Sequence, residues 1–391
     1  MNKKKITAMI TALTITAGAF FMPTVEAKMN TVEKIALGAA AVYFVSQYFA
    51  KMDNNQKALV GQVQSQTGVD KDPEANERVQ NIYESFRNTG YLTRDYEVYV
   101  CPDDELNASM NFGGILCVNK GTLNLLDDQE LAAVMAHEIT HGEERHNLKG
   151  ARKSVGLSVA TSLYLSNDAS YAEQILGNYI TYNIANGIFS KDEEKEADKE
   201  GFEYLVTAGY NPGAGAAAMQ VIYNNYGEGA PTGIKSIIMA GNHPKTSDRI
   251  NKNNKWMTEY SGKHVTVDKD GYITINGDKV LKAEKYGRYE AKERNWLTAG
   301  KIAKLYHEGN VKDAVNNNGI ITIDKTAIYT TSADEKADEI VKTMNKAISK
   351  DRGTKVEENY EIIKRAKEYN EKLAKEAAEK AAAENPAPGT N

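Results

Sequence analysis

The sequence predicts an α+β protein in which a mainly α-helical domain with a small β-sheet is followed by a small α/β domain and a helical tail. A chain of 391 residues, 41% hydrophobic and 26% charged, is longer than an average domain and has a globular composition. Short runs of strand-forming residues indicate few strands, and longer stretches with apolar residues three and four apart indicate helices. The C-terminal segment is rich in alanine and charge, which is typical of a solvated helix.

Composition narrows the classes of function. The formal net charge is -5, so no global basic field favours nucleic acid as the main partner. The globular balance also excludes collagen-like, wholly disordered and multi-spanning membrane chains as descriptions of the whole. Local sites must therefore account for the function.

Residues 1–27 have the layout of a signal peptide. Lys3, Lys4 and Lys5 precede the uncharged run Ile6–Met22, and Val25-Glu26-Ala27 supplies the small residues of a cleavage site. We expect export to a periplasmic or extracellular location and a mature chain that begins at Lys28. A buried N-terminal helix is the alternative.

Residues 28–74 are expected to form an N-terminal helical segment. Its apolar stretch, residues 35–50, has no charge but covers only 16 residues, whereas a membrane span needs about 20. Packing against the protein or contact with a membrane surface is favoured over spanning. If the signal segment stayed attached, the two apolar segments would instead form a membrane anchor.

Residues 75–254 are expected to form the main domain. Tyr96–Val100 and Gly114–Val118 are predicted strands, and the predicted helices cover residues 128–147, 170–208 and 212–226. The polar run 251–255 marks a boundary. Cys101 and Cys117 could form a disulfide in an oxidising compartment, or pack as small apolar residues on neighbouring strands.

Residues 255–350 are predicted to form a small α/β accessory domain without a catalytic signature. A hairpin is expected over 264–275 around Asp270-Gly271, a helix over 283–308, a strand over 319–329, and a further helix opened by a capping box at 332–335. Residues 351–391 form the charged tail, helical over about 356–383 and disordered at its end.

The string His137-Glu138-Ile139-Thr140-His141 is the first element with a chemical meaning. It lies in a predicted helix, where positions i and i+4 share a face, so both imidazoles can reach one Zn²⁺. Glu138, next to the first histidine, would point toward the water that such an ion activates. An exposed polar helix face is the alternative for this string taken alone.

A catalytic zinc site needs a third protein ligand and leaves one position for water. The acidic run from Phe189 to Gly201, FSKDEEKEADKEG, contains Glu194 and Asp198 at spacing i, i+4. One of these carboxylates could bind the metal while the other orients a ligand imidazole. Taken alone, such a run is most often an exposed helix face.

Together these motifs resemble the HtpX-like and CaaX-prenyl-protease-like family of zinc endopeptidases, which combine HExxH with a downstream Glu-x-x-Ala-Asp motif. Lys191 stands where that family usually has arginine, which puts a supporting contact in doubt. The resemblance extends over residues 75–250 through four further matches: Asn107-Ala108 with 113–118, Gly121-Thr122-Leu123, Ala208–Pro212, and His243-Pro244 with Arg249-Ile250.

The resemblance implies a zincin-like fold of the gluzincin type and a role for each motif residue. His137, His141 and Glu194 would bind one Zn²⁺ per chain, and Glu138 would act as general base. Asp198 would orient a ligand imidazole, and His243 could donate a hydrogen bond to the oxyanion, or simply pack against Pro244.

Polypeptides are the expected substrates. The strand Gly114–Val118 could bind an extended substrate if it lay at an edge, although an interior strand is equally compatible with the sequence. His146, His264 and His307 have no partner at ligand spacing and are assigned ordinary surface or packing roles.

The favoured function is a zinc endopeptidase acting on envelope or extracellular proteins, in a role such as protein quality control. The alternative is a chaperone-like envelope assembly factor with a structural or self-inhibited zinc site. The two differ at Glu138, because a closed structural site needs no general base and hydrolysis does.

Overall fold

The computed structural model describes residues 31–154, 178, 189–228, 245–333 and 335–384. The described chain is mainly helical and carries small three-stranded sheets, which confirms the expected α+β class. The signal segment 1–27, His243 and the end of the tail, 385–391, lie outside the described residues.

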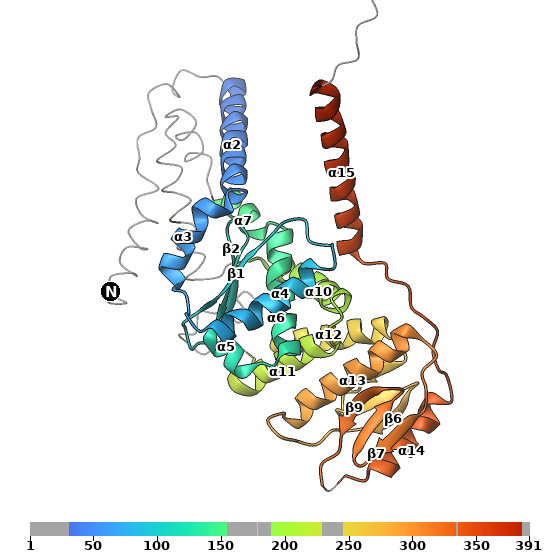
Figure 1. Ribbon diagram of the computed structural model, residues 1–391. Helices are drawn as coiled ribbons and strands as arrows, with labels where there is room; N and C mark the ends of the chain where they lie inside the picture. Colours follow the sequence, from blue (N-terminus) through green and yellow to red (C-terminus); the bar gives the residue numbers. More distant parts are fainter. Residues whose placement is uncertain (1–30, 155–177, 179–188, 229–244, 334, 385–391) are drawn as a thin grey trace, which may run out of the picture.

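The N-terminal segment consists of two helices, α2 (Thr31–Asp53) and α3 (Gln56–Thr67). Helix α2 projects away from the main domain in Figure 1, and Val42 and Tyr43 on it are exposed. Its last residue, Asp53, is buried, accepts the N–H of Gly113 and pairs with Arg94, which attaches the helix to the main domain. In the part of the chain that the structure describes, no helix has the length and apolar character needed to cross a membrane.

The sheet of the main domain contains β1 (Glu97–Cys101), β2 (Ala108–Asn111) and β3 (Ile115–Asn119) in the order β1-β3-β2. Strand β3 is parallel to β1 and antiparallel to β2, and all its residues are buried. The strand at 114–118 is therefore an interior strand, which is one of the two alternatives that the sequence left open, and it offers no edge to a substrate. Strand β2, which the sequence analysis did not predict, is an edge strand and packs against α6.

Cys101 and Cys117 are joined in a disulfide that links β1 to β3. Both residues are buried, and their Cα atoms are 6.1 Å apart. The disulfide and the packing on neighbouring strands, which the sequence left as alternatives, occur together.

The helices of the main domain surround this sheet (Figure 1). They are α4 (Pro73–Arg87), α5 (Lys120–Leu125), α6 (Asp128–Glu143), α7 (His146–Ser154), α10 (Lys191–Thr207), α11 (Ala214–Tyr226) and α12 (Thr246–Tyr260). The polar run 251–255 lies inside α12, so it is not a break in the chain; its polar residues mostly occupy the outer face of an amphipathic helix. The predicted helix over 128–147 is divided, because Arg145 adopts a φ of 55° between α6 and α7.

Helices α6 and α10 both begin with a capping box and pack closely against each other. Asp127 and Glu130 form a capping box at the start of α6, and Ser190 and Glu193 form one at the start of α10. Where the helices meet, a Cβ on Gly201 would lie 3.0 Å from the Cα of His137. The absence of a side chain at this position allows the two backbones to approach.

The accessory unit contains two antiparallel sheets and two helices. Its elements are β4 (Val265–Val267), β5 (Ile273–Ile275), β6 (Asp278–Leu281), α13 (Ala291–Glu308), β7 (Ala314–Asn317), β8 (Ile320–Ile323), β9 (Thr326–Thr330) and α14 (Ala337–Ile348). The predicted hairpin over 264–275 is present as β4 and β5. Residues 319–329 form a hairpin instead of one strand, because the chain reverses at Asp324, where φ is 54°.

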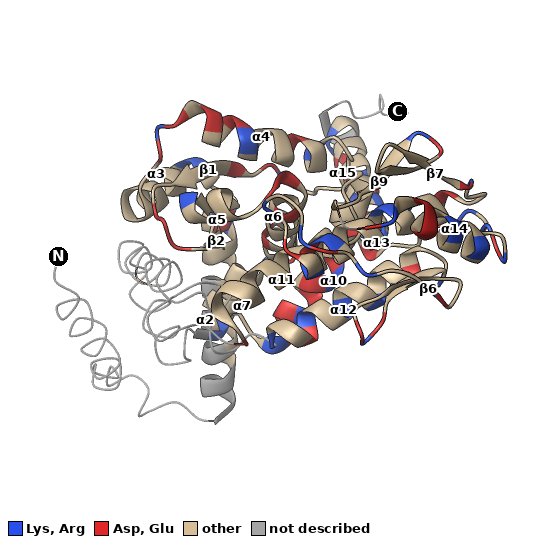
Figure 2. Ribbon diagram, turned by 90° about the horizontal axis from the view of Figure 1, so that it is seen from below, with Lys and Arg blue, Asp and Glu red and all other residues tan. Residues whose placement is uncertain are grey.

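The tail helix α15 (Glu361–Glu384) returns from the accessory unit to the main domain, where its first turns meet α10 (Figure 1). Ile362 and Ala366 are buried there, whereas the helix is solvent-exposed from residue 367 to 381. Acidic and basic residues both occur along the ribbons of α10 and α12 in Figure 2.

Candidate metal centre

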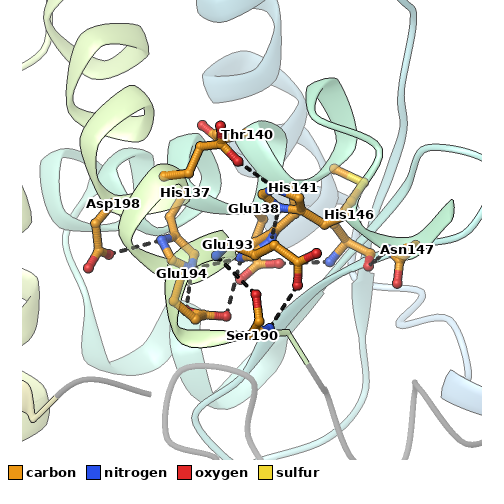
Figure 3. Close-up of polar contacts among 12 residues, drawn as sticks. His137, Glu138, Thr140, His141, His146, Asn147, Ser190, Glu193, Glu194 and Asp198 are labelled. Carbon is orange, nitrogen blue, oxygen red and sulfur yellow. Dashed lines mark hydrogen bonds and ion pairs between the residues drawn. The ribbon is translucent and has the colours of Figure 1, made fainter. Parts of the chain in front are cut away.

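Helix α6 brings the two histidines of the HEITH motif together. The Nε2 atoms of His137 and His141 are 3.2 Å apart, and the imidazole rings face each other edge to face. Figure 3 shows the two rings directed toward the side of α6 on which α10 lies. The spacing i, i+4 on a regular helix produces this convergence.

Helix α10 adds Glu194 from its first turn. One carboxylate oxygen lies 3.5 Å from Nε2 of His137, and the other lies 3.5 Å from Nε2 of His141. All three side chains are buried, and their donor atoms lie within 4.8 Å of one another. Two imidazole nitrogens and one carboxylate oxygen form a donor set that suits zinc, so these residues could hold a metal ion.

Asp198 lies behind His137, one helical turn beyond Glu194 on α10. Its Oδ1 atom is 3.1 Å from Nδ1 of His137. Arg249 of α12 binds the same carboxylate through Nε, at 3.0 and 3.1 Å, and through Nη2, at 2.5 Å. Nη2 of Arg249 also lies 3.3 Å from Nδ1 of His137, but the shorter contact is with the Asp198 carboxylate, which accepts the Nδ1–H. In the neutral imidazole this leaves the lone pair on Nε2, the nitrogen that faces Glu194.

The charges in this group shift one another's pKa values. Burial raises the pKa of Asp198, but the positive charge of Arg249 and the hydrogen bond with His137 outweigh it and leave that pKa below its usual value. Burial lowers the pKa of His137, but hydrogen bonds with Asp198 and Glu194 raise it to about 9. A metal ion must therefore displace a proton from His137 to bind there.

His141 is held by residues that the sequence analysis did not assign to the site. Its ring stacks on Phe189, with ring centres 3.8 Å apart. Its Nδ1 atom is 2.8 Å from Nδ1 of His146, whose Nε2 is 2.9 Å from Glu196. His146, expected to have an ordinary surface or packing role, is completely buried and has partners that its sequence spacing did not predict, because the turn at Arg145 folds it back against His141.

Glu138 lies on the sheet-facing side of α6, fully buried. Its Oε2 atom accepts the backbone N–H of Met110, on edge strand β2, at 2.8 Å. Its Oε1 atom has no hydrogen-bond partner among the described residues. Burial raises the pKa of this carboxyl to about 7, which suits a group that takes and returns a proton near neutral pH.

The structure thus brings His137, Glu138, His141, Glu194 and Asp198 together, and His243 cannot be placed. His264 and His307 lie in the accessory unit, where each stacks on a tyrosine. Arg249, Met110, Phe189 and His146 were missed as contributors. Arg249 belongs to a motif that the resemblance had matched, whereas the contacts of the other three depend on how the chain folds.

Comparison with known proteins agrees with the site. The model of peptidase family M48 matches residues 72–257. A Vibrio cholerae protein provisionally named beta-barrel assembly-enhancing protease is 26% identical over 223 residues, 54% of this chain and 43% of its own. The mitochondrial metalloendopeptidase OMA1 of Schizosaccharomyces pombe is 28% identical over 186 residues, 46% of this chain and 52% of its own. Metalloprotease LoiP of Escherichia coli is 29% identical over 129 residues, 32% of this chain and 50% of its own.

The chain spans about half, or less, of the length of these curated relatives. The family match encloses the HEITH helix, the Glu194 helix and Arg249, and it encloses the region 75–254 for which the motifs predict a peptidase domain. The accessory unit and the tail helix lie beyond it. The resemblance drawn from the motifs is confirmed at the level of the family: residues 72–257 of this chain form a domain of peptidase family M48.

Proposed function

We propose that the protein is a zinc-dependent endopeptidase that binds one zinc ion per chain through His137, His141 and Glu194. The observation that carries this proposal is the placement of Glu138 beside a three-ligand donor set. One oxygen of Glu138 is fixed by the N–H of Met110, and the other has no partner among the described residues. A structural metal site would need no such carboxylate.

A zinc ion in this site would supply a Lewis acid that polarises a peptide carbonyl and makes water nucleophilic at neutral pH. Glu138 would take a proton from the attacking water and return it to the leaving amine. Its pKa, raised by burial to about 7, favours both transfers at neutral pH. Asp198 would hold His137 in the tautomer that binds metal, and His243 is proposed as a hydrogen-bond donor to the oxyanion.

Polypeptides of the cell envelope or the extracellular space are the proposed substrates, with a role in protein quality control. Two of the relatives described above are named as a beta-barrel assembly-enhancing protease and a mitochondrial metalloendopeptidase, names that fit proteolysis. The layout of residues 1–27 supports export, and the exposed Val42 and Tyr43 on α2 support contact with a membrane surface. N-terminal sequencing of the native protein should give Lys28; retention of Met1 in the membrane fraction would favour the anchored alternative.

A second candidate is a chaperone-like envelope assembly factor with a self-inhibited zinc site. The observation that favours it is burial, because Glu138 and His141 are both 0% exposed. A substrate could reach these groups only after the chain moved. The two candidates predict the same metal binding and different hydrolysis.

The decisive experiment combines elemental analysis with proteolysis of unfolded casein. The protein should contain about one zinc per chain, and His141→Ala should lose most of it. Glu138→Gln should keep the metal, because glutamine is nearly isosteric, and lose hydrolysis because the water loses its base. Asp192→Asn, at an exposed carboxylate on α10, serves as the matched control and should behave like the unsubstituted protein.

Equal turnover by the Glu138→Gln variant would contradict the endopeptidase proposal. Zinc content near one with no turnover in any form would favour the assembly factor. A zinc content near zero after zinc-replete expression would contradict both.

A further inference from the structure

His146 is a buried histidine whose two ring nitrogens both have protein partners. Nδ1 lies 2.8 Å from Nδ1 of His141, and Nε2 lies 2.9 Å from a carboxylate oxygen of Glu196. The ring is completely buried, whereas the Glu196 side chain is 42% exposed. Helix α7 supplies the histidine and helix α10 supplies the carboxylate, so the three residues form a chain from the metal centre to the surface (Figure 3 labels His141 and His146).

Hydrogen-bonding capacity fixes the direction of this chain. An ionised carboxylate only accepts, so Nε2 of His146 must carry the proton that it donates to Glu196. In a neutral imidazole the other nitrogen then has a lone pair, so Nδ1 of His146 accepts. The 2.8 Å contact therefore requires Nδ1 of His141 to be the donor, and the lone pair of His141 is left on Nε2, 3.5 Å from Glu194.

The two histidines of the HEITH motif are thus oriented by different means. His137 contacts the carboxylate of Asp198 directly. His141 reaches Glu196 through an intervening imidazole. In both cases Nδ1 is the donor and Nε2 is the nitrogen that faces Glu194, which is the arrangement that zinc-binding histidines need.

A second metal site at His146 is the competing explanation, since donor atoms of Glu144, His146 and Glu196 also lie within 4.8 Å of one another. The contacts oppose it. Glu144 is already paired with Lys149, at 3.0 Å, and with Arg365. His146 has no nitrogen without a protein partner, so a metal ion would have to displace either His141 or Glu196.

We propose that His146 and Glu196 are positioning residues that hold His141 in the tautomer and ring orientation required for zinc binding. The proposal rests on the zinc site of the proposed function but not on hydrolysis. Residue Glu196 is one of several carboxylates in the acidic run 189–201, and the fold gives it this contact by placing α10 beside α7.

The tautomers can be measured without zinc or activity. Long-range ¹H–¹⁵N NMR of the full-length, metal-free protein with ¹⁵N-labelled histidine should show Nε2–H on His146 and Nδ1–H on His141. His146→Phe and His141→Ala assign the signals. Protonation of His146 at Nδ1 alone would overturn the proposal, and this result would be independent of any failure to detect proteolysis.

If His146 and Glu196 position His141, their loss should weaken zinc binding. Chelator competition at one pH measures the zinc affinity. His146→Phe and Glu196→Ala should weaken zinc binding about 10 to 100-fold, the usual cost of losing a partner of a ligand histidine. Glu196→Gln should bind more tightly than Glu196→Ala, because the amide oxygen can still accept from Nε2–H. Asp192→Ala, which removes another exposed carboxylate of α10, should leave the affinity unchanged.

Thermal unfolding of the metal-free variants separates positioning from folding. Glu196→Ala should leave the midpoint close to that of Asp192→Ala while zinc affinity falls. Unchanged zinc affinity in both His146→Phe and Glu196→Ala would overturn the proposal. So would a second bound zinc that is lost in His146→Phe while the first binds as before.

Discussion

The Nδ1 atom of His137 lies 3.1 Å from Oδ1 of Asp198, and this contact joins the two helices that carry the proposed ligands. Asp198 is itself held by Arg249 from α12, so three helices fix one imidazole. The Arg249 side chain is only 4% exposed, and the ion pair is therefore buried. Removal of this ion pair would affect both the orientation of His137 and the stability of the fold.

Asp198→Asn is expected to retain zinc with an affinity about 10 to 100-fold lower, because the amide no longer balances Arg249 or accepts as strongly from His137. Glu194→Gln should lose most of its zinc binding, since it removes a proposed ligand. Chelator titration of both variants measures the order of their zinc affinities. The reverse order would show that the two carboxylates have exchanged roles.

Asp198→Asn also leaves the Arg249 charge buried without its partner. Loss of one member of a buried pair typically costs about 3–5 kcal/mol. The control is the double variant Asp198→Asn/Arg249→Met, which should recover stability and retain the loss of zinc affinity. If the double variant also recovered zinc affinity, Asp198 would act on the fold alone.

Gly201→Ala should disturb the contact between α6 and α10. The added Cβ would lie 3.0 Å from both the N and Cα atoms of His137. These are backbone atoms, which cannot move aside as the end of a flexible side chain can. Overpacking of this kind usually costs about 1–3 kcal/mol. We expect a lower urea midpoint together with weaker zinc binding, whereas Gly61→Ala, where nothing lies within 4 Å of the added Cβ, should bind zinc normally.

The sequence was most informative where local rules decide the structure. Apolar residues at helical spacing around HEITH predicted α6, whose start is marked by the capping box of Asp127 and Glu130. Spacing i, i+4 also predicted that Glu194 and Asp198 share a face. These features depend on helical periodicity, which is visible in a single sequence.

Contacts between distant elements could not be predicted in this way. The interior position of β3 depends on the pairing of β2, Ala108–Asn111, which has only four residues and is too short for its alternation to predict a strand. The contact of His146 with His141 depends on a single residue with positive φ, Arg145, which turns the chain between α6 and α7. The polar run 251–255 indicated a domain boundary, whereas it lies in α12, whose buried residues, such as Ile250, Asn253 and Met257, recur at helical spacing.

Glu130, at the start of the HEITH helix, should make the stability of the protein depend on pH. It is fully buried at the third position of α6 and accepts the N–H of Asp127. Burial, followed by the negative charges of Asp127 and Glu293, raises its pKa to about 9. The folded protein therefore holds a proton here that the unfolded chain, with an ordinary carboxyl pKa of about 4.3, releases.

Between about pH 5 and pH 9 the folded state binds more protons than the unfolded state at this position, so stability should fall as pH rises. Glu130→Gln keeps the capping-box geometry and cannot ionise. We expect urea unfolding at pH 6 and pH 8.5 to show a smaller loss of stability for Glu130→Gln than for the unsubstituted protein. If the stability of the two proteins changed equally with pH, the raised pKa of Glu130 would be contradicted.

Arg365 connects the tail helix to the proposed metal centre. It lies near the start of α15, pairs with Glu144 at the end of α6, and binds Glu200 of α10 at 2.6 Å and the hydroxyl of Tyr204 at 3.2 Å. Glu203 accepts the N–H groups of Glu361 and Ile362 at the start of the same helix. A segment outside the family match thus links the two helices that carry the proposed ligands.

Arg365→Ala should lower the free energy of unfolding by about 1–3 kcal/mol, because Glu200, with a side chain only 9% exposed, would lose its cationic partner. Zinc affinity should fall as α6 and α10 separate, and Arg365→Lys should restore part of both, since the charge remains without the two-pronged geometry. Lys372→Ala is the matched control: this residue lies on the exposed part of α15, in a surface pair with Glu376, and should change stability by less than about 0.5 kcal/mol. Urea unfolding and chelator competition on the four full-length proteins test this, and an Arg365→Ala variant that matched Lys372→Ala in both would show that the tail helix has no influence on the metal centre.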